Sequence, residues 1–393
     1  MKLIDITGKA ISGEWGNDCE DGNGIPVLRT TNFTDTGVIN FANVVLRDIP
    51  TKDLSKKFLR PGDIIIEKSG GSDTKPVGRV VYFDSEENKY LINNFTGLLR
   101  VVDQTKWYPR YVFYALFANY SFGGTRQYEN KTTGLHNLKL DQYLNSFDIP
   151  DVDFQLQHHI ADTLDKVSEG IEVCRKMVDE LDLMVKAKFV EMFGDPVSNP
   201  MGWEEKKLGH VCKKLTDGTH FSPESFATGA YKYVTAKNIR INGFDFSNIT
   251  YIPEEVHRPI YERCNPEYGD VLYIKDGVTT GIAMVNTLHE EFSLLSSVAL
   301  LKQDRNVING CFLCGVLNNA EMYSNIRMNM GGAAITRLTI AKLNEIRVIV
   351  PPIELQEQFA TFVSKIDKSR LTIQQVLSKM EMVKLALMQE YFG

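Results

Sequence analysis

The sequence repeats itself at an offset of 199 residues, and this constrains the fold more than any other feature. Leu156-Gln157 corresponds to Leu355-Gln356, and Glu191–Gly194 corresponds to Glu390–Gly393 with no gap in between. Proline stands shortly before both copies. Because an internal repeat of this length is typical of repeated structural units, we expect two copies of one plan rather than one large domain.

The longer segments that precede these copies also correspond, at an offset near 206. Gly62-Asp63 aligns with Gly269-Asp270, and a lysine follows each pair, at Lys68 and at Lys275. The order along the chain is therefore globular segment, short segment, globular segment, short segment. The further correspondences are Asn32-Phe33 with Asn238-Ile239, Gly37 with Gly243, and Thr133–Leu138 with Ala334–Leu338.

Each short segment has the apolar periodicity of a long helix. Apolar residues recur at spacings of four and three over three to four heptads, which is typical of a coiled coil. Each helix of about 38 residues would be about 57 Å long. The alternative is one compact core that contains both helices, but a stiff spacer between two globular units explains the spacing better. The recurring positions are Ile160, Leu164, Val167, Ile171, Cys174, Val178, Leu181 and Val185, and then Phe359, Phe362, Ile366, Ser369 (polar), Ile373, Val376, Met380, Val383 and Leu387.

The globular segments have the pattern of mixed α+β domains. Short β-rich runs such as Ile64–Ile66 are separated by Gly, Asp and Asn turns, which predicts strands. Tyr111–Phe117 and Cys311–Leu317 are too apolar for a surface and predict short buried helices. We therefore expect an α+β fold in four parts. The parts are a domain at residues 1–150, a helix at 151–195, a second domain at 196–352 and a second helix at 353–393.

Composition and charge exclude several classes of protein. The 393 residues carry a net charge of −6, and residues 151–195, with 5 basic and 11 acidic groups, account for all of it. The two domains are neutral, so each can still carry a local basic face for nucleic acid. The chain has no apolar run of about 18 residues and no signal-peptide pattern at its start. Six cysteines in so long a chain do not form a disulfide framework, so we expect a cytoplasmic protein with no membrane segment.

The common catalytic motifs are missing from the sequence. There is no Gly-x-x-x-x-Gly-Lys-Ser/Thr loop, no Gly-x-Gly-x-x-Gly after a strand, and no Asn/Asp-Pro-Pro-Tyr/Phe motif of an adenine-N6 methyltransferase. His158-His159 cannot chelate one metal, because adjacent helical side chains point about 100° apart. Cys311-x-x-Cys314 lacks a second pair of ligands. We therefore expect no catalytic residue and no metal site.

One group of residues resembles the metal site of a nuclease. Asp63, Glu67 and Lys68 form an acidic pair followed by lysine, but the usual spacing is not kept, and the second copy, with Asp270 and Lys275, has no such glutamate. A turn that opens a strand explains the recurring Gly-Asp better. A metal-dependent nuclease that uses Asp63 and Glu67 is nevertheless the alternative from a different class of protein.

Three features together carry a resemblance to a known family. The first is the duplicated order of domain and long helix. The second is the pair of helix starts, Ile149–Gln157 and Val350–Gln358, and the third is the opening of the second domain, Thr216–His220, with Lys237-Asn238-Ile239 and Gly243 following. On these features the whole chain resembles the specificity subunit of a type I restriction-modification system. The first domain departs from the pattern, since Ile11-Ser12-Gly13 replaces the Asp-Gly-x-His opening.

The resemblance implies a function that composition does not show. Such a subunit binds a bipartite site on double-stranded DNA, with one target-recognition domain for each half-site, and is itself not an enzyme. Its two long helices pack as an antiparallel pair, which makes the repeat pseudo-twofold, set the distance between half-sites and dock adenine-N6 methyltransferase subunits, two of them. Motor-nuclease subunits then join. S-adenosylmethionine, ATP and magnesium belong to these partners, so we expect no cofactor in this chain. The nearest alternative is a subunit of a modification-only system, or another orphan DNA- or RNA-binding scaffold without nuclease partners.

The candidate DNA contacts are polar residues in glycine-rich loops. Glycine lets the backbone approach phosphate, while Thr, Lys and Arg donate hydrogen bonds to phosphates or base edges. In the first domain the candidates are Lys68, Ser69, Ser72, Arg126, Gln127 and Lys131. In the second domain they are Thr216, Thr219, His220, Lys237, Asn238, Lys275, Thr279, Thr280, Thr336 and Arg337.

The candidate partner contacts are apolar residues of the helices that lie outside the main seam. Apolar residues that two paired helices leave exposed normally mark an interface. They are Met177, Met184 and Phe189 in the first helix, and Leu371, Leu377 and Tyr391 in the second.

Overall fold

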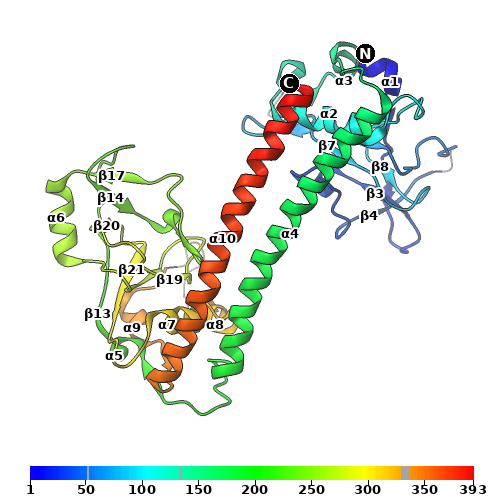
Figure 1. Cartoon of the computed structure of the whole chain (residues 1–393). Coiled ribbons are helices and arrows are strands. Elements are labelled where there is room, and N and C mark those ends of the chain that lie inside the picture. Colours follow the sequence, from blue (N-terminus) through cyan, green and yellow to red (C-terminus); the bar gives the residue numbers. More distant parts are fainter. Residues whose placement is uncertain (51–52, 133–134, 329–336) are drawn as a thin grey trace. The chain divides into compact units, whose positions relative to one another are not determined.

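The chain divides into two compact units, each with its own hydrophobic core (Figure 1). The first consists of Met1–Arg175 and Gln375–Gly393, and the second of Lys176–Gln374. The computed structural model describes all residues except 51–52, 133–134 and 329–336, and of residues 131, 132 and 135 it describes only the backbone. Each unit contains one globular domain and parts of both long helices. Neither helix therefore forms a compact unit of its own.

The first domain is built on two four-stranded sheets. One has the strand order β1-β9-β5-β7 with antiparallel pairs, and the other has the order β2-β4-β3-β8, in which β3 and β8 are parallel. A three-stranded sheet, β10-β11-β6, lies beside them. The strands are β1 (Ile11–Ser12), β2 (Asn17–Asp18), β3 (Ile25–Leu28), β4 (Val45–Asp48), β5 (Ile64–Glu67), β6 (Ser69–Gly71), β7 (Val80–Tyr82), β8 (Leu91–Ile92), β9 (Thr96–Leu99), β10 (Glu129–Thr132) and β11 (Leu135–Leu138). The helices are α1 (Leu3–Thr7), η1 (Thr30–Asn32), α2 (Pro109–Ser121), η2 (Arg126–Tyr128) and α3 (Leu140–Ser146).

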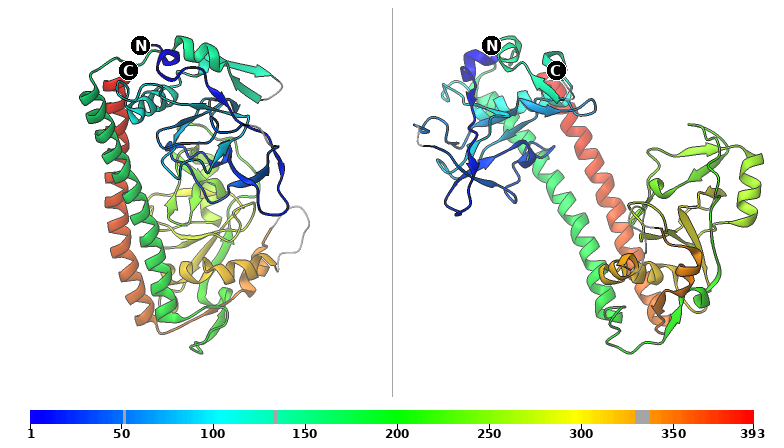
Figure 2. Two further views of the ribbon diagram at one scale, coloured as in Figure 1. Left: turned by 90° about the vertical axis from the view of Figure 1, so that its right-hand side faces the viewer. Right: turned by 180° about the vertical axis from the view of Figure 1, so that it is seen from behind.

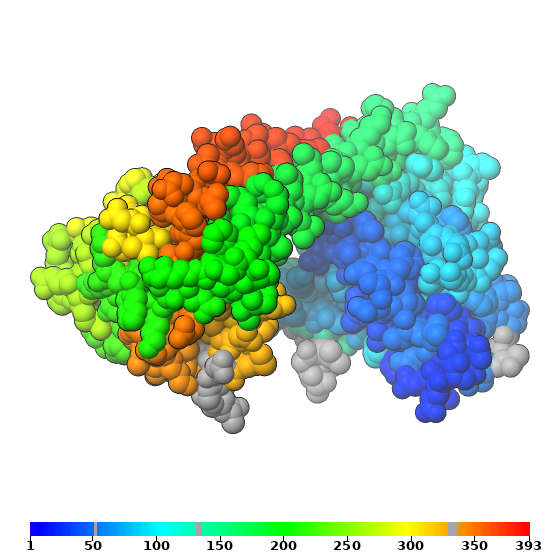
Figure 3. All heavy atoms as spheres, turned by 90° about the horizontal axis from the view of Figure 1, so that it is seen from below, coloured from blue at the N-terminus to red at the C-terminus, as the bar shows by residue number. Residues whose placement is uncertain are grey.

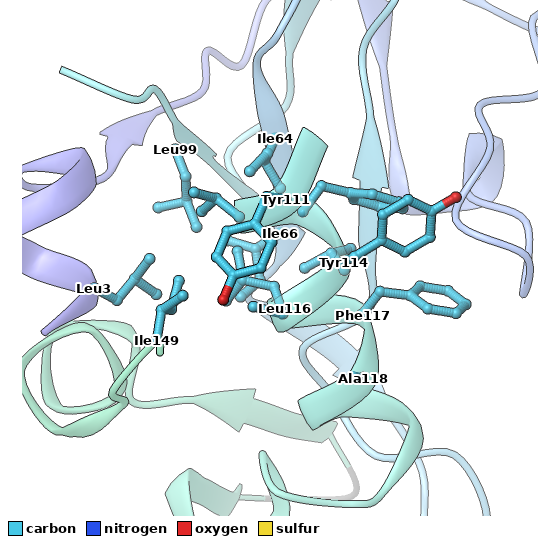
Figure 4. Packing of buried hydrophobic residues seen from close by; sticks show 14 of the residues in the cluster. Leu3, Ile64, Ile66, Leu99, Tyr111, Tyr114, Leu116, Phe117, Ala118 and Ile149 are labelled. Atoms are coloured by element: carbon cyan, nitrogen blue, oxygen red, sulfur yellow. The ribbon is translucent and has the colours of Figure 1, made fainter. Parts of the chain in front are cut away.

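Helix α2 forms the centre of the first core. Its side chains are buried on all sides from Tyr111 to Ala118, as expected for a helix segment that is apolar all round. Tyr111 and Leu116 pack among Ile64, Ile66 and Leu99 of the sheet and Leu3 and Ile149 of the chain ends of the domain (Figure 4). The buried helix predicted at residues 111–117 is thus present.

The second domain repeats these pairings. Its main sheet has the order β13-β21-β18-β19 with antiparallel pairs, and its second sheet has the order β17-β14-β20, in which β14 and β20 are parallel. The strands are β12 (Glu205–Lys207), β13 (Cys212–Asp217), β14 (Tyr231–Val234), β15 (Ile239–Arg240), β16 (Gly243–Phe244), β17 (Thr250–Ile252), β18 (Val271–Ile274), β19 (Ala283–Val285), β20 (Phe292–Leu294), β21 (Val298–Gln303) and β22 (Arg347–Ile349). The helices are α5 (Leu208–Val211), η3 (Ala236–Asn238), α6 (Glu254–Arg263), α7 (Gly310–Leu317), α8 (Ala320–Met328) and α9 (Ile340–Glu345).

The recurring Gly-Asp opens the equivalent strand in each domain. The Asp63 carboxylate accepts a hydrogen bond from the Arg60 N–H (2.7 Å) just before β5, and the Asp270 carboxylate accepts one from the Glu267 N–H (2.9 Å) just before β18. Gly62 and Gly269 have φ of 95° and 85°, a conformation that favours glycine. The interpretation of this motif as a turn is therefore correct.

The two long helices are α4 (Phe154–Phe193) and α10 (Ile353–Phe392), each of 40 residues (Figures 1 and 2). In the first unit Arg175 of α4 donates to Glu381 of α10 at 2.8 Å. In the second unit Asp182 pairs with Arg370, and Phe189 packs on Phe359. The residue number of the contact in α10 therefore decreases as the residue number in α4 increases. The helices are therefore antiparallel within this unit, and both reach its surface on the face shown in Figure 3. Within the described ranges, no helix combines the length and apolarity needed to cross a membrane.

The seam of α10 differs from the predicted one. Val376 and Val383 were expected in it but are exposed, whereas Arg370, Leu377 and Lys384 are partly buried. Periodicity counts apolar residues only and therefore could not place these two cations in the seam. The seam predicted for α4 is largely present, since Ile160, Leu164, Ile171 and Cys174 are buried.

Candidate nucleic-acid interface

Backbone hydrogen bonds tie four loops of the second domain together at one end of its sheets. The Thr219 N–H donates to Leu294 O (2.8 Å), and the Ser296 N–H donates back to Thr219 O (2.8 Å). The Lys275 N–H donates to Ser297 O (2.9 Å), and the Ala236 N–H donates to the Ser297 hydroxyl (3.3 Å). The loops after β13, β14, β18 and β20 therefore form one continuous surface.

Asp217 is the charged centre of this surface. Its buried carboxylate lies 3.1 Å from Lys275 Nζ, 3.2 Å from His220 Nε2 and 3.5 Å from Arg263 Nη1. Lys275 is itself buried, so this ion pair connects the end of β13 to the loop after β18 beneath the surface. His220 is 57% exposed and Arg263 is 47% exposed, so these two members of the cluster can meet a ligand.

The structure separates the predicted DNA contacts of the second domain into two groups. His220, Lys237, Thr279 and Arg337 are exposed, and Thr216 is half-buried. Thr219, Asn238, Lys275 and Thr280 are buried. Thr336 lies outside the residues that the structure describes.

The buried members satisfy their own loops. The Asn238 side-chain carbonyl accepts from the Thr235 N–H (3.0 Å), and its amide donates to Asp245 O (3.2 Å). The Thr280 hydroxyl donates to Gly277 O at 2.7 Å. Asn32 repeats the Asn238 arrangement in the first domain, accepting from the Arg29 N–H at 2.9 Å. These side chains shape the loops from inside.

The predicted DNA contacts of the first domain gather around the sheet of β6, β10 and β11. Lys68 and Ser69 are half-buried at the start of β6, and burial lowers the pKa of the Lys68 ammonium. Ser72 is exposed, and its hydroxyl accepts from the Lys75 N–H (3.1 Å). Arg126 and Gln127 are exposed in η2. Lys131 lies in β10, where the structure describes its backbone but not its side chain.

Backbone hydrogen bonds also reveal which residues of the first domain are equivalent to the predicted DNA contacts of the second domain. The Glu14 N–H donates to Ile92 O at 2.8 Å, as the Thr219 N–H does to Leu294 O. Gly13 and Gly218 precede them, and at both positions a Cβ would collide with a carbonyl oxygen at about 2 Å. Trp15 therefore occupies the position of His220.

Phe95 and Arg29 follow in the same way. Lys68 donates its N–H to Phe95 O (2.8 Å) as Lys275 does to Ser297 O, so Phe95 occupies the position of Ser297. The Asn93 N–H donates to Leu28 O as the Leu295 N–H does to Val234 O. Arg29, which follows Leu28, therefore occupies the position of Thr235, which follows Val234. Trp15, Phe95 and Arg29 were missed, because only the Gly13–Gly218 match gave a signal and the residues after it are not alike.

The nuclease alternative has no support in the arrangement of its two carboxylates. Arg100 donates two hydrogen bonds of 2.7 Å to Asp63, and Arg79 donates two of 3.0 and 3.1 Å to Glu67. Both carboxylates are buried, and because each already pairs with an arginine, neither is free to bind a metal ion. Among the described residues, no three of His, Cys, Asp and Glu are grouped to hold a metal.

The fold agrees with solved structures along the whole chain. The S subunit of a type I restriction-modification system from M. genitalium has 16% identity and a TM-score of 0.57, covering 100% of this chain and 95% of that one. A structure reported under "Structural basis underlying complex assembly and conformational transition of the type I R-M system" has 14% identity and a TM-score of 0.56, with 100% and 96% covered. The class of protein is therefore a two-domain α+β protein with the fold of such subunits, and the predicted fold class is confirmed.

The family follows from the second half of the chain. Residues 200–381 match the family described as Type I restriction modification DNA specificity domain. Residues 200–381 thus match a type I restriction-modification DNA specificity domain, and the family predicted from the sequence is confirmed.

Proposed function

We propose that this chain is the DNA-reading subunit of a type I restriction-modification complex and has no catalytic activity of its own. Each domain reads one half of a bipartite site on double-stranded DNA. The chain gives adenine-N6 methyltransferase subunits, two per complex, their specificity for that sequence. Motor-nuclease subunits join the same complex. We propose further that the complex works in the cytoplasm.

One observation carries this proposal. The two domains hold the same loops with the same backbone hydrogen bonds, but the exposed side chains on these loops differ. Trp15 and Phe95 of the first domain stand where His220 and Ser297 stand in the second. A shared framework with different reading groups is what two different half-sites require, because sequence is read by side chains at base edges, whereas backbone contacts position the domain.

The helices supply the surface for partners. Met177, Met184 and Leu371 are exposed, which supports the proposal that they contact a partner. The other three predicted contacts have different surroundings: Phe189 is buried against Phe312 and Phe359, Leu377 is half-buried, and Tyr391 packs on the core of the first unit. Exposed apolar side chains on a helix favour docking of a protein partner. We assign S-adenosylmethionine, ATP and magnesium to the partners and no cofactor to this chain.

Methylation mapped with and without the chain tests this function. The methyltransferase partner, S-adenosylmethionine and unmethylated genomic DNA are incubated with and without the full-length chain, and methylated adenines are located by sequencing. We expect methylation at one bipartite sequence only when the chain is present. Methyl transfer by the chain without the partner, or the same methylated positions in its absence, would contradict the proposal.

A further inference from the structure

A pocket opens in the first domain beside the loop that carries Trp15. Its volume is about 230 Å³. Val27 and Val45 contribute apolar surface to its lining, and Trp15 and Phe95 contribute aromatic rings that meet edge to face with centroids 5.6 Å apart. Both rings are more than 40% exposed. Exposed apolar side chains that meet in one patch, as these two rings do, often mark a ligand-binding site.

The pocket also contains a cation without an acceptor. Arg29 lines it, and its Nε is buried and has no hydrogen-bond partner among the described residues. The neighbouring charges are taken, because Arg47 pairs with Asp18 and Glu14 pairs with Lys57. A half-buried guanidinium is favourable only when it finds acceptors, so the pocket suits a ligand that brings them.

The shape of the site limits what the ligand can be. A base that stays paired shows only its edge at the floor of a groove, and proteins read it with groups that project into the groove. A hollow in the protein must instead receive a group that projects from the DNA, which is a phosphate or an unstacked base. Phosphate sites are made of backbone N–H groups and cations, whereas valine and aromatic rings favour a flat apolar face.

We propose that this pocket holds one base of the first half-site, unstacked from the duplex, against Trp15 and Phe95. Arg29 donates to the acceptors on its edge. Guanine fits best, because it presents O6 and N7 side by side to a guanidinium. Stacking on the two rings offsets the loss of stacking in the duplex. This inference rests on the proposed function and names the reading group of one of its half-sites.

The second domain serves as an internal comparison. His220 and Ser297 occupy the positions of Trp15 and Phe95, and Thr235 occupies that of Arg29. The aromatic pair and the free guanidinium are therefore both absent at these three positions. We expect the second half-site to be read without unstacking.

Fluorescence of 2-aminopurine tests the inference. The full-length chain, alone and with its methyltransferase, first selects its site from random duplexes. The site is then made with 2-aminopurine at each position in turn, and fluorescence is measured at a saturating concentration of the chain without the methyltransferase, because the methyltransferase unstacks its own target adenine. We expect the wild type to raise the fluorescence several-fold at or next to one position of one half-site. An abasic residue opposite that position should tighten binding, because no pair has to be opened.

The variants identify the pocket. Trp15→Ala and Phe95→Ala should abolish the rise, Trp15→Phe should keep most of it, and Arg29→Gln should relax selection at that one position. Phe122→Ala is the matched control, since Phe122 is 44% exposed and lies outside the pocket, while Phe95 is 41% exposed. Quenched fluorescence at every position with saturated binding overturns the inference, as does wild-type behaviour of Trp15→Ala. If no sequence is selected at all, the proposed function fails with it.

Discussion

Gln157 and Gln356 stand 199 residues apart and make the same three hydrogen bonds. Each side-chain carbonyl accepts a backbone N–H at 2.8 Å, from Tyr108 before α2 or from Asn309 before α7. Each amide donates to two backbone carbonyls, one in the loop before that buried helix and one just before the long helix. Both residues are at most 1% exposed. Each glutamine therefore fastens a long helix to its own domain.

Replacing either glutamine with leucine should destabilise its unit. Gln157→Leu or Gln356→Leu leaves one N–H and two carbonyls of a largely buried site without their side-chain partner, which costs about 2–4 kcal/mol in the free energy of unfolding. For a unit of this size that lowers the melting temperature by roughly 5–10 °C. Thermal unfolding of the full chain measures it.

The same helices provide controls. Gln155→Leu and Gln358→Leu change exposed glutamines next to the buried ones and should shift stability by less than about 0.5 kcal/mol. Equal melting temperatures for the buried and exposed variants would show that the shared hydrogen bonds do not hold the helix starts.

These glutamines illustrate what the sequence could predict. Gln157 and Gln356 were aligned because identical residues at a fixed offset point to the same structural role. Asp63 and Asp270 were interpreted correctly as turns for the same reason. Helix type and length were also predictable, since α4 and α10 have uninterrupted periodicity.

The site was predictable only in part. Polarity and glycine content located the loops, but they do not tell whether a side chain faces DNA or satisfies its own loop, as Asn238 and Lys275 do. Trp15 was missed because its equivalence to His220 lies in backbone hydrogen bonds, which unlike residues can share. Arg370 shows the same limit in the helix seam, because partners distant in sequence decide where a charge is buried.

Lys275 should matter to stability more than its place in a DNA loop suggests. Lys275→Met leaves the buried Asp217 carboxylate without its closest cation, which should destabilise the second unit by about 2–4 kcal/mol. Lys213→Met is the control, because Lys213 is exposed and pairs with Asp304 at 3.4 Å, and it should change stability by under about 1 kcal/mol. Urea unfolding compares the two, and a Lys275→Met protein as stable as wild type would contradict the structural role of this ion pair.

Lys384 should make the first unit more stable as pH rises above 8. Burial lowers the pKa of this lysine to about 8, and nearby Arg110 and Arg175 act in the same direction, while Asp165 and Glu172 oppose them. Between pH 8 and its usual value of 10.5 the unfolded chain binds a proton that the folded chain lacks, so stability rises with pH.

Lys384→Met should remove this dependence. Because the folded state no longer has to bury a charge, the variant should be about 2 kcal/mol more stable than wild type at pH 7, after allowance for partial exposure and for the contact with the Phe117 ring at 4.9 Å. Unfolding at pH 7, 8 and 9.5 measures this, and Lys379→Met, at an exposed position of the same helix, should behave as wild type. A wild-type protein that loses stability from pH 8 to 9.5 would exclude this role for Lys384.

The helix surface of the second unit should bind the methyltransferase. Met184 is 49% exposed and Leu371 is 58% exposed. Met184→Glu and Leu371→Glu, combined, should weaken the complex by roughly tenfold or more while leaving the melting temperature unchanged, because a charge replaces apolar contact only at the interface. Lys186→Glu adds negative charge to α4 without removing an apolar side chain and should bind nearly as wild type. Co-purification and titration measure this, and full affinity in the double variant would place the partner elsewhere.

The claim that each domain reads its own half-site is tested most directly by the DNA that the chain selects. Random duplexes bound by the full-length chain are sequenced for the wild type and for His220→Ala. We predict two short fixed blocks separated by a gap of constant length in which every base is accepted. His220→Ala should relax the base preference in one block and leave the other block unchanged, because His220 is an exposed residue of the second domain and that domain reads one half-site. One continuous block, or relaxation of both blocks by His220→Ala, would contradict the account.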